Sequence, residues 1–318
     1  MTPVLEFSHE QFASTLKAMG DSLRMQILKV LGESSFGVLE LSQIFEMKQS
    51  GMSHHLKTLA NAKLVTTQRE GNSIFYRRSL ANTFNVTQQI FLTIDDVQLD
   101  DHVTTNLNII EQERELNSQA FFAKHAGDFK QQQDLIAKYS SYQSLCEEMM
   151  RSINANKTQA LEIGPGEGEF LQALSKQYKN VLALDISNAL LDVAKKNSAE
   201  HSLNNIEFKL EDINNIENPF ADLIVMNMVL HHIVRPQAFM LQAANLLNAN
   251  GHLMITDLCQ HDQQWAKENC GDVWLGFSQE QLESWAHKAG LLITKTSFVA
   301  MRNGFQVQCL LFTKFKKT

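Results

Sequence analysis

The sequence predicts a two-domain protein, in which a small N-terminal α+β domain is followed by a larger α/β domain built on a mostly parallel sheet. The chain has 318 residues, of which 44% are apolar and 20% charged, and this suits two ordinary globular domains. Residues 20–80 contain helix-period segments followed by a hairpin pattern. From residue 159 onward, short apolar runs alternate with amphipathic helices, as a parallel sheet covered on both faces requires.

Composition argues against several other classes. The start, MTPVLEFSHEQF, lacks a basic region followed by an apolar core, and apolar runs such as LLITKTSFVAM are interrupted well short of the ~20 residues of a membrane span. We therefore expect a cytoplasmic protein without a membrane partner. The cysteines are far apart and form no C-x-x-C pair, so neither a disulfide framework nor a thiolate metal site is indicated. They are Cys146, Cys259, Cys270 and Cys309.

Charge is unevenly distributed along a chain whose net charge is −7. Residues 48–78 carry six cations and one anion, whereas residues 95–115 carry seven acids and one arginine. This asymmetry predicts an anionic partner for the first region only.

The N-terminal elements follow from periodicity. DSLRMQILKVLGE has one apolar helix face, with Asp21 or Ser22 as the N-cap. VLELSQIF predicts a short helix, EMKQ a turn, and SGMSHHLKTLANAKL a longer helix with Met52, Leu56 and Leu59 facing inward. VTTQRE and SIFYRRS flank a Gly-Asn turn and predict a hairpin. A helix-turn-helix followed by a hairpin is a winged helix.

DSLRMQILKVL, SGMSHHLKTLANAKLV and REGNSIFYR resemble the ArsR/SmtB family of dimeric winged-helix bacterial repressors, over roughly residues 10–80. In that family the second helix enters the major groove of operator DNA and the wing follows the backbone or the minor groove. The resemblance implies base or phosphate contacts from Gln49, Ser50, Ser53, His54 and His55, and backbone contacts from Lys57, Arg69 and Arg77. Alternatively, the two histidines are ordinary surface residues on a helix that caps a core.

Many members of that family sense metals, through thiolates before the recognition helix or through Asp and His on the last helix. Here VLELSQ holds no thiolate. Asp100 and His102 are present, but the chain reads EQERE around Glu113, where a histidine pair would complete the site. We expect no metal and a solvated acidic helix; zinc at Asp100 and His102 is the alternative.

Residues 81–120 are expected to be connector helices, between a winged helix at 1–80 and a second domain at 121–318. Apolar residues recur there at helical spacing, at Val103, Leu107, Ile110 and Leu116. In the resembled family the helix after the wing dimerises the repressor, so we expect a homodimer. The next segment contains aromatic residues that either pack or form a lid over a ligand. These are Phe122, Phe129, Tyr139 and Tyr142.

The strand ALEIG runs into PGEGEF, which places Gly164, Gly166 and Gly168 at a strand-to-helix turn where the backbone can approach a ligand. Asp185 ends the next strand, about twenty residues on, where a carboxylate can accept both hydroxyls of a ribose. Asp212 ends the third strand, where a carboxylate commonly meets the adenine amino group of a bound nucleoside. Dinucleotide binding is the competitor, but the loop lacks G-x-x-G spacing, and Glu167 and Glu169 would repel phosphate.

LEIGPGEGEFL, ALDIS, EDI, ADLIVMNMVLHHI and ANGHLMITDL, in this order, resemble class I S-adenosylmethionine-dependent methyltransferases over roughly residues 120–318. The resemblance implies a Rossmann-like, mostly parallel seven-stranded sheet that binds S-adenosylmethionine or S-adenosylhomocysteine. Carried over by residue, it assigns the methionine end to Glu162 and Gly164, the ribose to Asp185 with Ile186 beside it, the adenine to Asp212 and Ile213, and the floor under the sulfonium to Asn227 and Met228. The alternative for each carboxylate is a helix cap or a loop charge.

Catalysis is harder to predict, because methyl transfer depends largely on alignment and can proceed without an acid, a base or a nucleophile. His231 and His232 are candidate bases, although LHH after this strand also recurs as plain structure. MNMVLHH departs from the N/D-P-P-Y motif of nucleic-acid amino methyltransferases, and the cysteines are not placed as in arsenic methyltransferases.

Two functions follow from these patterns. The first is a dimeric regulator of operator DNA whose second domain binds S-adenosylmethionine or S-adenosylhomocysteine as a small-molecule effector. The second is an active small-molecule methyltransferase with an attached repressor domain. It requires a pocket for a methyl acceptor beyond Asn227, shaped by His231, Trp274 and Phe277.

Overall fold

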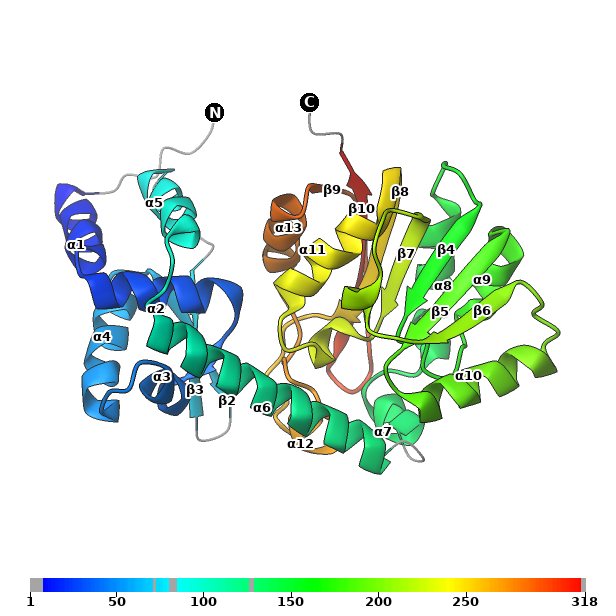
Figure 1. Cartoon of the computed structure of the whole chain (residues 1–318), viewed down its shortest axis with the longest axis horizontal. Helices are drawn as coiled ribbons and strands as arrows, with labels where there is room; N and C mark the ends of the chain where they lie inside the picture. Colours follow the sequence, from blue (N-terminus) through cyan, green and yellow to red (C-terminus); the bar gives the residue numbers. More distant parts are fainter. Residues whose placement is uncertain (1–7, 71–72, 80–84, 126–128, 316–318) are drawn as a thin grey trace. The chain divides into compact units, whose positions relative to one another are not determined.

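The structure, a computed structural model, describes residues 8–70, 73–79, 85–125 and 129–315. The chain forms two compact units, Met1–Arg114 and Glu115–Thr318, which are described separately (Figure 1). The functional ranges 1–80, 81–120 and 121–318 stay a prediction, because they divide the chain by role rather than by packing.

The first unit is mainly helical, with a small antiparallel sheet in the order β1-β3-β2. Its elements are α1 (His9–Met19), α2 (Ser22–Glu33), β1 (Phe36–Gly37), α3 (Val38–Ile44), α4 (Gln49–Asn61), β2 (Val65–Glu70), β3 (Ser73–Arg78) and α5 (Asn85–Asp96), followed by the beginning of α6 (Asp101–His125).

Local sequence explains these elements. Asp21 caps α2, because its Oδ1 accepts the Arg24 backbone N–H at 2.9 Å. The inward residues of α4 are fully buried, as predicted; they are Met52, Leu56 and Leu59. The hairpin is also confirmed, with Glu70 opposite Ser73. The Gly-Asn turn itself lies outside the described residues. The first unit is therefore a winged helix.

Helix α6 begins in the first unit and packs there through apolar residues. Val103 and Ile110 are buried and Leu107 is partly buried, but Leu116 is 64% exposed. The Arg114 guanidinium binds the Glu40 carboxylate of α3 at 2.6 Å and lies over the Phe36 ring. Three of the four apolar positions at helical spacing therefore pack against the first unit.

The second unit is built on a seven-stranded sheet in the order β6-β5-β4-β7-β8-β10-β9. Its strands are β4 (Gln159–Ile163), β5 (Asn180–Asp185), β6 (Ile206–Leu210), β7 (Ala221–Asn227), β8 (Leu247–Leu258), β9 (Leu291–Ala300) and β10 (Gln306–Lys314). Only β10 runs antiparallel to its neighbours, β8 and β9. The predicted Rossmann-like, mostly parallel seven-stranded sheet is confirmed.

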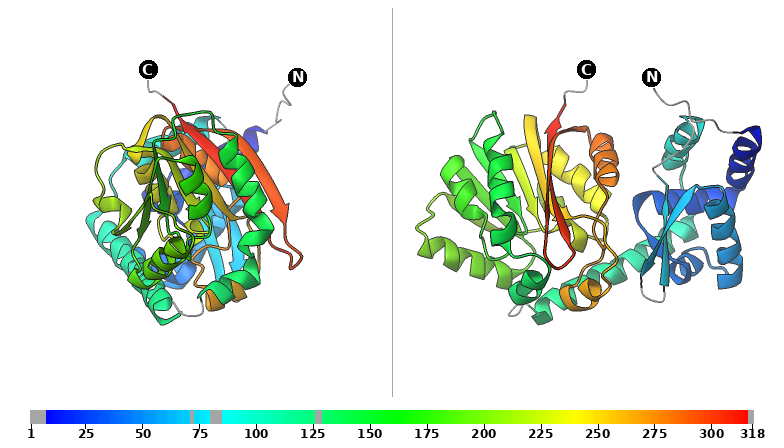
Figure 2. Two further views of the ribbon diagram at one scale, coloured as in Figure 1. Left: turned by 90° about the vertical axis from the view of Figure 1, so that its right-hand side faces the viewer. Right: turned by 180° about the vertical axis from the view of Figure 1, so that it is seen from behind.

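Helices cover both faces of this sheet (Figure 2). They are α7 (Phe129–Ile136), α8 (Tyr139–Arg151), α9 (Leu171–Gln177), α10 (Asn188–Glu200), α11 (Pro236–Leu246), α12 (Trp265–Cys270) and α13 (Gln279–Lys288), with short 3-10 turns η1 (Ile213–Asn215) and η2 (Leu230–His232). Successive residues of β4 enter opposite cores: Ala160 packs with α8 and α9, and Leu161 packs with α11 and α13. None of the described helices has the length and apolar character needed to cross a bilayer.

Candidate functional site

Helix α4 presents a polar face opposite its buried residues. Five of the residues predicted to contact DNA have exposed side chains on this helix; they are Gln49, Ser50, Ser53, His54 and Lys57. His55 is only half-buried, and its ring lies edge-on to that of His54 at 6.2 Å. The helix can therefore offer hydrogen-bonding groups and one cation to a partner without unfolding its core.

The wing carries less available positive charge than the sequence count suggests. Arg69 on β2 is exposed, but Arg77 on β3 is half-buried, and burial lowers the pKa of its guanidinium. Arg78 is 5% exposed and makes a bidentate pair with Asp95 at 2.6 and 2.8 Å. Arg78 is thus committed to the fold, and Arg69 is the most accessible cation of the two strands.

The acidic helix offers little for a metal. Asp100 Oδ2 accepts the Gln26 side-chain amide at 2.9 Å, and His102 is exposed to solvent. Where the structure describes the chain, the grouping of His, Cys, Asp and Glu side chains that is tight enough for an ion includes neither residue.

The second unit brings its predicted cofactor residues to the carboxyl edge of the parallel strands. Ile163 pairs with Leu184 of β5 and with Met226 of β7, and the Gly164 N–H donates to the Leu184 carbonyl at 2.8 Å. The loop after β4 therefore lies between the ends of β5 and β7, where ligands bind in open α/β sheets.

The glycines of this loop have conformations that other residues adopt only with strain. Gly164, Gly166 and Gly168 have φ angles of +63°, +56° and +82°. A Cβ at Gly164 would lie 2.7 Å from the Val229 Cγ2, so this position also needs the missing side chain for space. A Cβ at Gly166 would meet nothing within 4 Å, so the backbone there faces open space.

Two buried side-chain oxygens at the edge have no hydrogen-bond partner within the described chain. Glu162 is 1% exposed and its Oε2 is unpaired, as is the buried Oδ1 of Asn227. Burial raises the pKa of the Glu162 carboxyl well above its usual value. Because unpaired buried acceptors are costly, this edge is prepared for a ligand that donates hydrogen bonds.

Asp185 ends β5 as predicted. Its Oδ1 accepts the Ser187 N–H at 2.8 Å, and burial raises the pKa of the carboxyl to about 6 although backbone hydrogen bonds oppose the shift. The side chain of Ile186, the next residue, is 60% exposed and gives the edge an apolar surface.

Asp212 and Ile213 follow β6 and have strong local roles. Asp212 is exposed, and its Oδ1 caps η1 by accepting the Asn214 N–H at 2.8 Å. The Ile213 side chain is 2% exposed and belongs to the core. Only the second oxygen of Asp212 and the backbone of Ile213 can meet a ligand without rearrangement.

Met228 follows β7 with a φ of +56°, which is unusual for a side chain that is 2% exposed. Its N–H donates to the Thr256 carbonyl at 2.8 Å, and this bond helps to hold the strained backbone. Such strain clusters at functional sites.

His231 and His232, in η2, belong to a buried polar cluster that includes two carboxylates not singled out from the sequence. His231 Nδ1 lies 2.8 Å from Asp257 Oδ1, and its Nε2 lies 3.7 Å from Asp272 Oδ1. Burial alone would lower the pKa of His231, but these carboxylates raise it to about 9. Burial lowers the pKa of His232 well below its usual value, and the Phe122 ring lies edge-on to its imidazole.

Sequence could have flagged Asp257, which closes the apolar run of β8, but Asp272 lies in a loop without periodicity. The aromatic residues predicted near the acceptor are core residues instead: Trp274 is 5% exposed and Phe277 fully buried. Among the lid candidates, Tyr142 packs in the core and Tyr139 is half-buried. The Phe129 side chain lies outside what the structure describes.

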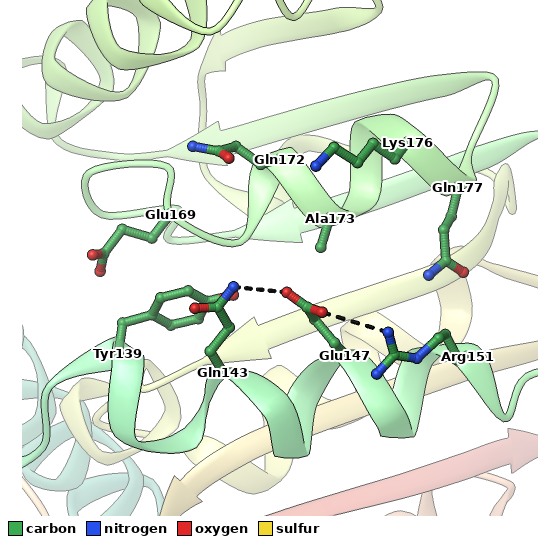
Figure 3. A pocket seen from close by; sticks show the side chains of 9 residues that line it. All are labelled: Tyr139, Gln143, Glu147, Arg151, Glu169, Gln172, Ala173, Lys176 and Gln177. Carbon is green, nitrogen blue, oxygen red and sulfur yellow. Dashed lines mark hydrogen bonds and ion pairs between the residues drawn. The ribbon is translucent and has the colours of Figure 1, made fainter.

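Two cavities lie beside this edge. One of about 360 Å³ separates α8 from α9, with Gln143 and Lys176 among its lining residues (Figure 3). Another of about 260 Å³ lies outside the glycine loop. At its rim, Lys130 Nζ binds Glu167 at 2.7 Å and Glu169 at 3.2 Å. Lys130 therefore partly neutralises Glu167 and Glu169, so the expected repulsion of a phosphate by these two acids is weaker than the sequence suggests.

Comparisons with known proteins recover both units. The family model described as bacterial regulatory protein, arsR family, matches residues 21–67, and the model described as methyltransferase domain matches residues 154–290. A model described as tRNA (Uracil-5-)-methyltransferase matches residues 55–216, but that range begins inside α4 and ends before β7, so it corresponds to no folded unit of the chain.

Individual proteins agree with this division. The arsenical resistance operon repressor of Staphylococcus aureus is 31% identical over 83 residues, which are 26% of this chain and 80% of the repressor. The ubiquinone biosynthesis O-methyltransferase of Coxiella burnetii is 32% identical over 100 residues, which are 31% of this chain and 42% of that enzyme. A solved complex between the Haloferax volcanii Trm112 methyltransferase activator and a methyltransferase shares the fold, at 13% identity and a TM-score of 0.51, over 62% of this chain and 97% of that chain.

Proposed function

Because the chain belongs to the ArsR family of bacterial regulatory proteins and also carries a methyltransferase domain, we propose that it is a dimeric, DNA-binding transcription regulator whose second unit binds S-adenosylmethionine or S-adenosylhomocysteine as its effector. The observation that carries the effector is the pair of unpaired, buried oxygens of Glu162 and Asn227 at the ends of adjacent strands. The other features of the edge are compatible with that ligand.

The residues present fit such a ligand. Its ammonium group can donate to Glu162 and Asn227, and its ribose hydroxyls can donate to Asp185. The open space over Gly166 lets a ligand approach the backbone. Ile186 offers an apolar surface beside the ribose position. When bound, S-adenosylmethionine supplies an electrophilic methyl group, whereas the side chains described here bind and orient the nucleoside.

The DNA-binding role rests on α4 and on exposed apolar residues of the connector. Gln49, Ser53 and His54 have exposed donors and acceptors that can meet base edges, and the exposed Lys57 can contact a phosphate. Leu92 on α5 and Ile109 on α6 are 51% and 47% exposed, and a dimer interface would remove their apolar surface from water. A twofold axis near these helices would bury them and present two α4 helices to a palindromic operator.

An effector role requires only that the second unit binds the ligand, whereas catalysis also requires a bound and aligned methyl acceptor. With a pKa of about 9, His231 is protonated near neutral pH and is a poor general base. Binding alone can change the operator affinity, provided that the ligand prefers one of two dimer conformations. The side chains at the edge suffice for such binding.

A methyltransferase with an attached repressor is the second candidate. The strained backbone of Met228 beside Asn227 favours it, because strain at that position is kept where a reacting group must be placed. The similarity to an O-methyltransferase, over less than half of that enzyme, is compatible with a hydroxyl acceptor.

Calorimetry with both ligands, followed by incubation with methyl-labelled S-adenosylmethionine, tests the proposal. We expect 1:1 binding to the wild type, weak binding to Asp185→Asn, and no release of S-adenosylhomocysteine in the presence of hydroxyl-bearing metabolites. Absence of binding would contradict the proposal, and multiple turnovers with one acceptor would favour the second candidate.

A further inference from the structure

The buried cluster around His231 has an arrangement that hydrogen bonds among its members do not explain. His231, His232 and Asp272 each offer one nitrogen or oxygen atom, and these three atoms lie within 4.8 Å of one another. In the metal-free protein His232 Nδ1 also donates to the Gly271 carbonyl, at 3.2 Å. The Asp272 side chain is fully buried, and neither of its oxygens has a hydrogen-bond partner in the described chain. The nearest positive charge to this carboxylate is the protonated His231, whose Nε2 lies 3.7 Å away without a hydrogen bond.

The distances distinguish a shared cation from direct hydrogen bonds. Asp272 Oδ1 lies 3.7 Å from His231 Nε2 and 3.8 Å from His232 Nδ1. Both distances exceed the ~2.7–3.2 Å of a hydrogen bond between nitrogen and oxygen. Two ligand atoms of one zinc ion lie roughly 3.3–3.6 Å apart, because each is about 2.0–2.2 Å from the metal. Small adjustments would bring the three atoms into one coordination sphere.

Asp257 prepares His231 for this role. One of its oxygens faces the His231 Nδ1 at 2.8 Å, and the other accepts the His231 backbone N–H at 3.3 Å. This clamp keeps a proton on Nδ1 and turns Nε2 toward Asp272. Imidazole ligands of metals are commonly oriented by a carboxylate in this way.

Charge balance supports the same conclusion. Asp257 and Asp272 both have fully buried side chains, and in the metal-free protein the protonated His231 offsets only one of their two negative charges. One divalent ion would neutralise both carboxylates while both imidazoles remain neutral.

We propose that His231 Nε2, His232 Nδ1 and an Asp272 oxygen bind one divalent transition-metal ion, which displaces the protons of both nitrogens to solvent, with Asp257 as the positioning residue. Two imidazoles and one carboxylate suit zinc and its first-row neighbours better than magnesium or calcium. Three protein ligands leave at least one coordination position open. The site follows the end of β7 and contacts Phe122 of α6 through His232.

Zinc titration of the chelator-treated full chain, in competition with a chromophoric chelator, tests this proposal. We expect one zinc per chain, and weaker binding by about 10–100-fold in Asp257→Asn, which removes the orienting carboxylate but leaves all three ligands. Asp272→Asn, which removes a ligand, should weaken binding more than that. Circular dichroism melting of each variant verifies that it is folded, and His232→Gln provides a second test if Asp272→Asn is not.

His102→Ala is the matched control, because it removes the alternative zinc site on the acidic helix and should leave binding unchanged. Cobalt should give visible bands of a nitrogen and oxygen ligand set without intense thiolate absorption. The proposal is overturned if the wild type takes up no stoichiometric zinc, if Asp272→Asn binds zinc normally, or if only His102→Ala loses it.

Discussion

The Nδ1 of His231 lies 2.8 Å from Oδ1 of Asp257, and both side chains are almost completely buried. This pair joins η2, which follows β7, to the end of β8. The pair therefore fixes the backbone that follows β7, next to Asn227 and Met228, whether or not a metal is bound.

Asp257→Asn should destabilise the second unit of the metal-free protein by about 2–4 kcal/mol, because it leaves a buried imidazolium with one carboxylate fewer. Thermal unfolding followed by circular dichroism measures the change. Asp192→Asn is the control, since Asp192 pairs with Lys195 at 3.3 Å on the exposed side of α10 and should cost less than ~1 kcal/mol. Equal melting temperatures for the two variants would show that the buried pair contributes no more than a surface pair.

The affinity for S-adenosylmethionine should fall as the pH falls below about 6, because Asp185 is then protonated and cannot accept both ribose hydroxyls. Calorimetry across this range measures the effect, with Asp185→Asn as the reference for titration of the ligand itself. A variant with the same pH profile as the wild type would rule out Asp185 as the group responsible.

The same shift affects the stability of the ligand-free protein in the opposite direction. The folded pKa of Asp185, about 6, lies above its ordinary value of 3.8. Its contribution to stability is therefore fully present below pH 3.8 and is lost as the pH rises through about 6. Comparing urea unfolding of wild type and Asp185→Asn at several pH values tests this, and the difference between them should grow with pH.

Gly166→Ala and Gly290→Ala form a matched pair. Both glycines have positive φ angles, +56° and +77°, and a Cβ at either would meet nothing within 4 Å. Each substitution should therefore cost about 1 kcal/mol of stability. Only Gly166→Ala should weaken binding of S-adenosylhomocysteine, because its methyl group would occupy the open side of the loop. Unchanged binding by this variant would place the ligand elsewhere.

Lys57→Ala should lower operator affinity about equally for all sequences and reduce the slope of log affinity against log salt by about one. Fluorescence anisotropy at several salt concentrations measures this slope. Lys195→Ala removes the same charge from the second unit and should leave it unchanged. If both variants behave alike, Lys57 does not contact a phosphate.

Periodic features were predictable from the sequence because one local rule determines each. The inward face of α4 follows from the 3.6-residue period, and Gly164 follows from the left-handed backbone of the strand-to-helix turn. The parallel sheet follows from the alternation of apolar runs and helices, which leaves few other ways to bury both faces.

Features that depend on distant residues were not predictable. Lys130 pairs with Glu167 and Glu169 across more than thirty positions, and no sequence pattern announces these contacts. The sequence count includes Arg78 among the cations of the first region, but its buried pair with Asp95 makes it a structural residue. Asp272 enters the histidine cluster from an irregular loop. Each of these contacts is created by tertiary packing rather than by local periodicity.

Operator binding at fixed salt, titrated separately with S-adenosylmethionine and S-adenosylhomocysteine, tests the central claim most directly. The regulator account predicts that one of the ligands shifts the affinity of the wild type by ~1 kcal/mol or more. Asp185→Asn, which binds the ligand weakly, should show no shift at the ligand concentration that saturates the wild type. An unchanged operator affinity at saturating ligand, with occupancy verified by calorimetry, would contradict coupling between the two units.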